Sequence, residues 1–205
     1  ENNPQSSLLQ ADPMEFEKNF QKEFPMFIMN FEEGIPNGSF LENYQNGKPK
    51  IITNMQDGIF DGEFGEFYES GEMRMTGRVI GGKKEGEWKE FLKSGEVISS
   101  QFYSRGILEG RSVRYFPGGQ INWEGTFKEG NLDGPYVFYL PDSTIKQKGL
   151  FANGVRVGEW LERLEIMSDF YRKGSYKNGF KEGEWQLVNI EGKFLQSEIY
   201  EQGKL

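Results

Sequence analysis

The sequence of 205 residues contains no cysteine and no histidine. Without cysteine there are no disulfide bonds and no thiolate nucleophiles, and without histidine there is no Ser-His-Asp chemistry. Both absences together exclude nearly every kind of zinc site. Catalysis would have to use Asp, Glu, Lys, Ser or Tyr alone. We predict that the protein is not an enzyme and holds no metal or cofactor.

The sequence also lacks long apolar runs and an excess of positive charge. No apolar stretch approaches the roughly 20 residues of a membrane-spanning helix. The net charge is -8, from 32 acidic and 24 basic residues, which is unfavourable for binding a phosphate backbone or an anionic membrane. We therefore expect no nucleic-acid partner and no integral membrane span.

Glycine is abundant, with 27 residues, and it recurs at fixed intervals. Opening glycines follow one another at steps of 24 or 25 residues, and each of the first seven is followed four residues later by a second glycine. Such a period predicts stacked supersecondary units. The opening glycines are Gly34, Gly58, Gly82, Gly106, Gly130, Gly154, Gly179 and, in a partial unit, Gly203. The second glycines are Gly38, Gly62, Gly86, Gly110, Gly134, Gly158 and Gly183.

Each unit has the same order of residue types. Two residues after the second glycine stands an aromatic residue, except at Ser112; an alternating run, a turn glycine and a second apolar-periodic run follow. This pattern predicts strand, tight turn, strand and a Gly-x-x-x-Gly turn. With no room for crossover helices, the strands must be antiparallel. We predict an all-β, elongated single-layer meander of stacked hairpins. The aromatic column is Phe40, Phe64, Trp88, Tyr136, Trp160 and Trp185.

The N-terminal part has a different character. Residues 1–13 are polar and aperiodic, and we predict a disordered tether. Residues 14–33 are either a degenerate capping repeat or a short helix followed by a strand, with Met26 to Phe31 a strand in both cases. The repeat array covers residues 34–205. The polar start is compatible with a chain that follows a removed signal segment, which favours the periplasm or cell surface; the alternative is the cytoplasm.

Two segments carry a family resemblance. Gly82-Lys83-Lys84-Glu85-Gly86-Glu87-Trp88-Lys89-Glu90-Phe91 and Gly179-Phe180-Lys181-Glu182-Gly183-Glu184-Trp185 resemble the MORN repeat family in its bacterial variant form. The resemblance implies hairpin repeats and a role in binding or scaffolding rather than catalysis. It also implies that antitoxin-like partners of toxins and surface lipoproteins are among the relatives. The matching positions are structural, so no functional residue carries over.

Several sets of residues admit both a functional and a structural interpretation. The aromatic column could form a ligand platform, but its presence in nearly every unit favours packing between repeats. The glycine pairs lack the Lys-Ser/Thr of a phosphate-binding loop and are predicted to be turns. Two series of acids would form ladders on the sheet, and a solvated face interleaved with lysines is favoured over a cation site or an acid/base pair. The first series is Glu63, Glu87, Glu159 and Glu184; the second is Glu42, Glu66, Glu90 and Glu162.

The apolar turn residues Ile59, Phe60, Ile107 and Phe180 are either packed locally or part of an exposed binding rim. A single-layer sheet cannot bury both faces, so apolar surface should remain available to a partner. We predict a non-catalytic scaffold that binds an unidentified protein. The alternatives are a cell-surface or periplasmic carbohydrate-binding module and an antitoxin-like partner, and a hydrolase with two carboxylates ranks last. A terminal strand near Tyr200 would be an open edge able to pair with a second copy.

Overall fold

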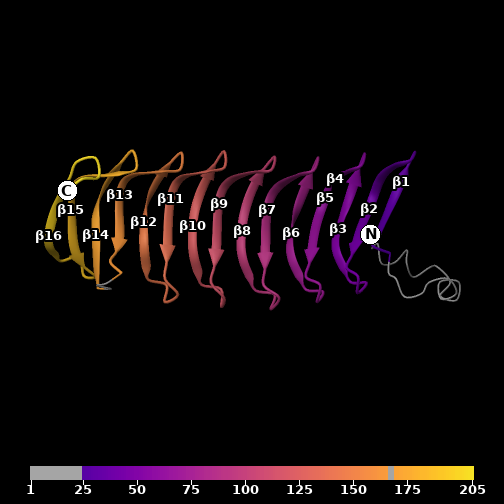
Figure 1. Cartoon of the computed structure of the whole chain (residues 1–205), viewed down its shortest axis with the longest axis horizontal. Helices are drawn as coiled ribbons and strands as arrows, with labels where there is room; N and C mark the ends of the chain where they lie inside the picture. The colour runs from indigo at the N-terminus through magenta and orange to yellow at the C-terminus, as the bar shows by residue number, and fades with distance from the viewer. Residues whose placement is uncertain (1–24, 166–168) are drawn as a thin grey trace. The chain divides into compact units, whose positions relative to one another are not determined.

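The computed structural model describes residues 25–165 and 169–205. These residues form antiparallel strands in meander order, with none in a helix (Figure 1). The prediction of an all-β hairpin meander is therefore confirmed. The predictions for residues 1–13 and 14–24 lie outside the described residues, as do residues 166–168 of the repeat array. In the described residues there is no helix with the length and apolarity to cross a bilayer.

The first of two compact units comprises residues 25–83 and 93–95. Its strands are β1 (Phe27–Glu32), β2 (Ile35–Asn43), β3 (Pro49–Gln56), β4 (Ile59–Phe60), β5 (Gly62–Phe67) and β6 (Met73–Ile80). The short strands β4 and β5 both pair with β3, so together they occupy the place of one longer strand. The strand predicted from Met26 to Phe31 is present as β1.

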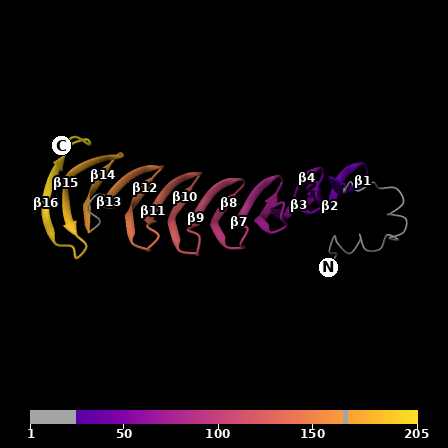
Figure 2. The same cartoon turned by 60° about the horizontal axis from the view of Figure 1, so that its bottom comes forward.

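The second unit comprises residues 84–92 and 96–205. Its strands are β7 (Lys83–Phe91), β8 (Val97–Ser104), β9 (Ile107–Tyr115), β10 (Ile121–Lys128), β11 (Asn131–Tyr139), β12 (Ile145–Ala152), β13 (Val155–Arg163), β14 (Phe170–Lys177), β15 (Phe180–Asn189) and β16 (Phe194–Tyr200). They lie side by side in chain order and are bowed in the same sense (Figure 2). Each strand alternates side chains between two faces of one layer.

The turn at each opening glycine is shorter than the sequence pattern suggests. Between β12 and β13 it consists of Asn153 (φ 48°) and Gly154 (φ 78°) only. Two successive positive φ angles are the signature of a type I′ hairpin. The second glycine of the unit, Gly158, lies inside β13, with a φ of 62° and a register shift opposite it. The Gly-x-x-x-Gly segment is therefore a two-residue turn followed by a β-bulge. A bulge of this kind places a glycine at positive φ, which explains why the second glycine recurs in each unit.

These turns predict a stabilising substitution. Glu129 occupies the same position as Asn153, with a φ of 50°, which costs a residue with a long side chain more than it costs asparagine. We expect Glu129→Asn to raise the free energy of unfolding by about 0.5–1 kcal/mol. Urea unfolding followed by circular dichroism measures the change. The reverse exchange, Asn153→Glu, should lower stability by a similar amount, and a gain from Asn153→Glu would contradict the explanation.

Successive repeats are tied together at these turns by two hydrogen bonds. The amide of Gly130 donates to the carbonyl of Leu108 (3.0 Å), and the amide of Glu129 donates to the Glu109 carboxylate (2.9 Å). The bond to the carboxylate recurs in other repeats, and in each case the acid accepts from the backbone amide 20 residues later. The other accepting acids are Asp61, Glu85, Asp133 and Glu182. These acids precede the second glycine, and we call them the clasp acids. They belong to neither acid series singled out from the sequence.

Candidate functional site

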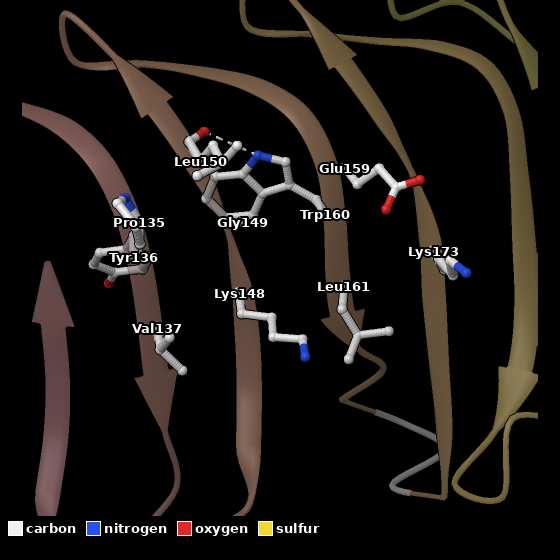
Figure 3. A pocket seen from close by; sticks show the side chains of 10 residues that line it. All are labelled: Pro135, Tyr136, Val137, Lys148, Gly149, Leu150, Glu159, Trp160, Leu161 and Lys173. Carbon is white, nitrogen blue, oxygen red and sulfur yellow. Dashed lines mark hydrogen bonds between the residues drawn. The ribbon is translucent and has the colours of Figure 1, made fainter.

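The aromatic column is buried against a second set of glycines. Trp160 is 1% exposed and lies over the backbone of Gly149 on the neighbouring strand β12. Its Nε1 donates a hydrogen bond to the Leu150 carbonyl at 3.2 Å (Figure 3). Its ring contacts Phe151 and Tyr176 edge-on, at centroid distances of 5.1 and 5.7 Å. Trp185 lies over Gly174 in the same way. The rings thus form inter-repeat core, the interpretation favoured from the sequence.

Cationic side chains cover the indoles on their other side. Arg156 lies 4.3 Å from the Trp160 ring centroid, and Lys181 lies 3.9 Å from that of Trp185. Lys84 covers Trp88 in the same manner at 4.3 Å. Each cation stands two residues before the second glycine of its unit. Bulky side chains occupy this position in the other units as well, but the sequence pattern alone did not single it out. Since a sugar needs a free ring face to stack, these three rings offer no platform.

Glu162, two residues after Trp160 on β13, is surrounded by hydrogen-bond donors. Glu162 accepts hydrogen bonds from Arg156 (2.8 Å) and from the Tyr176 hydroxyl (2.8 Å), and Lys181 lies 3.3 Å away. Burial raises the pKa of Tyr176, and its hydrogen bond to the ionised Glu162 raises it further. The phenol therefore stays protonated at neutral pH and acts as a donor. Two cations and a phenol thus compensate the charge of Glu162.

Four other acids of the two series each have a cation or a hydrogen-bond donor beside them. Glu42 pairs with Lys50 at 2.6 Å, Glu66 pairs with Arg74, and Glu90 accepts a hydrogen bond from Ser99. Glu87 accepts one from Ser100 at 2.8 Å, which lowers its pKa. Within the described part of the chain, no three acids converge as metal ligands. The ladders are interleaved with donors and cations.

Ser112 interrupts the aromatic column and is completely buried, with an Oγ that has no hydrogen-bond partner. The neighbouring strand supplies a ring instead. Trp123 stands two residues before Gly125, the Cα partner of Ser112, and stacks on Tyr136 at 6.3 Å. The ring series therefore continues from another strand where the repeat lacks its own aromatic.

The apolar turn residues are partly packed and partly exposed. Ile59, Ile107 and Phe180 are each about half exposed. A Cβ built on the next opening glycine would lie 3.2 Å from Ile59, 3.5 Å from Ile107 and 3.3 Å from Phe180. Each side chain thus covers the turn of the following repeat. Phe60 lies within the ring series, 5.0 Å from Phe40.

The face opposite the rings carries an open hollow. On β13 the residue after Trp160 is Leu161, which points to the other side of the sheet (Figure 3). Leu161 is the Cα partner of Lys148 on β12 and of Lys173 on β14. A hollow of about 510 Å³ spans these strands and extends to Val137 and Leu150. A second hollow of about 490 Å³ shares Leu161 and Lys173 with it. We call this surface the lysine face.

The lysine face is apolar with unneutralised positive charge. Leu150 is 45% exposed, and no other layer covers it within the second unit. Among the ion pairs of the described residues, none involves Lys148 or Lys173. Glu159 is the one acid lining the first hollow. This juxtaposition escaped the sequence analysis because it depends on the register of three strands.

Comparisons of the sequence with family models and curated proteins, and of the structure with solved structures, give different results. No family model matches the chain, and no curated protein matches it. Among solved structures, one match is the crystal structure of a GtfA/B complex bound to UDP and GlcNAc, with 9% sequence identity and a TM-score of 0.26. It covers 63% of this chain and 24% of the other, a likeness too low to carry an argument. The MORN resemblance therefore stays a prediction, as does pairing of the terminal strand β16 with a second copy.

Proposed function

We propose that this chain is a non-catalytic scaffold that binds another protein through the lysine face of its second unit. The supporting observation is the exposure of Leu150 beside Leu161 and Val137, on a sheet face with no covering layer. An uncovered apolar hollow rimmed by charged groups is typical of a contact surface. The ring face, by contrast, is closed by its own side chains.

The proposal predicts that one negative charge added to the lysine face weakens partner binding. A photo-crosslinking residue placed at Leu161 in cells identifies the partner, and its affinity for the purified chain is then measured by calorimetry. We expect Leu150→Asp to weaken that affinity at least tenfold, because it removes an apolar contact and places in it a carboxylate that must lose its water on binding. Val155→Asp is the matched control, since Val155 is 40% exposed but lies at a turn, and it should bind as the wild type does.

Two outcomes would overturn the proposal: equal binding by the Leu150→Asp variant, or crosslinking that is as strong from Val155 as from Leu161. The carbohydrate alternative is less favoured because Arg156 and Lys181 cover two of the rings on which a glycan could stack. A change in tryptophan fluorescence on adding cell-wall glycans would favour the carbohydrate alternative instead. The antitoxin-like role rests on the resemblance alone.

A further inference from the structure

The lysine face presents its two positive charges with an apolar side chain between them. Lys148, Leu161 and Lys173 lie in one cross-strand line over β12, β13 and β14, and Figure 3 shows Leu161 between the two lysines. Neighbouring strands are about 4.8 Å apart, so the lysine Cα atoms are separated by about 10 Å. A ligand that matches the line has an anionic, an apolar and an anionic group in that order.

The charge of this line is opposite to that of the chain as a whole. The chain carries -8, whereas the side chains lining the first hollow comprise two lysines and one glutamate. Several basic side chains elsewhere on the sheet are paired internally, as Arg156 and Lys181 are with Glu162, whereas no ion pair of the described residues includes Lys148 or Lys173. The two lysines are therefore available for an external carboxylate.

We infer that the lysine face holds an acidic helical peptide segment of the partner protein. Two carboxylates seven residues apart on a helix are separated by about 10 Å along its axis and point to the same side. Apolar residues three and four positions after the first acid lie between them on that side. The carboxylates pair with Lys148 and Lys173, and the apolar pair lies on Leu161 and Leu150. This inference rests on the proposed function and names the chemistry of the partner.

The test uses fluorescein-labelled helical peptides and the full chain, with binding followed by fluorescence anisotropy. The probe is an alanine-rich 15-residue peptide with two glutamates seven positions apart and two leucines between them. We expect it to bind, and we expect the Lys148→Glu, Lys173→Glu double variant to weaken binding about tenfold or more at low salt. Lys128→Glu, with its exposed side chain on β10, is the matched control and should leave binding unchanged.

Three further probes decide the ligand class. Peptides with lysines in place of the glutamates, or with the glutamates only three positions apart, should bind at least tenfold more weakly. Equal binding of either peptide would overturn the inference, as would loss of binding in the Lys128→Glu control. Vesicles of phosphatidylcholine and phosphatidylglycerol should not bind, and their binding through Lys148 and Lys173 would assign the face to lipid instead.

The two proposals can fail separately. If the crosslinked partner is lost in Leu150→Asp but retained in the double lysine variant, the face binds protein without an acidic segment, and only this inference is overturned. If neither variant affects the partner, the proposed function fails as well.

Discussion

We expect Gly149→Ala to be among the most destabilising single substitutions in the second unit. A Cβ built on Gly149 lies 2.2, 2.3 and 2.6 Å from three atoms of the Trp160 indole. The indole cannot move away because Phe151 and Tyr176 contact its edges and Arg156 covers it. Overpacking of this kind costs about 1–3 kcal/mol and sometimes more. Urea unfolding followed by tryptophan fluorescence and circular dichroism measures the loss.

A double-mutant cycle isolates the cause of that loss. In a Trp160→Leu background the smaller side chain leaves room for the added methyl group, so Gly149→Ala should cost much less there. The same cost in both backgrounds would mean that the glycine is needed for its backbone freedom and not for the space above it. Gly174→Ala, which clashes with Trp185 at 2.4 Å, should repeat the result one unit later.

Trp160→Ala should cost about 3–5 kcal/mol, the range for removing a buried aromatic side chain. The loss should also be local. In a repeat array each unit contacts only its neighbours, so destabilisation is greatest at the mutated repeat and falls away from it. Native-state hydrogen exchange should show lost protection first in β12, β13 and β14, with β8 and β9 amides retaining theirs.

The matched comparison for Trp160→Ala is Trp123→Ala. Trp123 is only half-buried, and its removal leaves a smaller cavity, so we expect a smaller loss centred on β10 and β11. Uniform loss of protection across all strands of the second unit in either variant would contradict nearest-neighbour stability.

The glycine period was enough to predict the hairpins, because a turn with two positive φ angles favours glycine at a fixed place. Gly154 and Gly158 both have positive φ, but local spacing alone could not distinguish a four-residue turn from a short turn and a bulge. That difference depends on pairing with β12. The clasp acids were missed for a similar reason, since Glu109 and Glu129 lie 20 residues apart and the bond goes to a backbone amide.

The remaining features require knowledge of which residues face each other. Gly149 stands in an ordinary strand and carries no turn signature, so its role as the floor beneath Trp160 emerges only from the register. The same holds for Lys148 and Lys173, which the sequence separates by 25 positions and the sheet places on either side of Leu161. The glycine period identifies the repeats, whereas the features that distinguish one repeat from another lie at the positions where their sequences differ.

The clasp acids have a consequence for how such a chain evolves. Each bond reaches back by a constant offset, so a duplicated block of one period arrives with its partners already in place and requires no compensating change. Genes of this kind can lengthen or shorten by whole units through unequal recombination. The unit with Val157 departs from this rule. It has valine where the units that open at Gly58, Gly82, Gly106, Gly130 and Gly179 have a clasp acid, and Gly179 reaches back to Arg156 across one additional residue. Copies of that unit would inherit a weaker junction, which makes it the least favourable template for expansion.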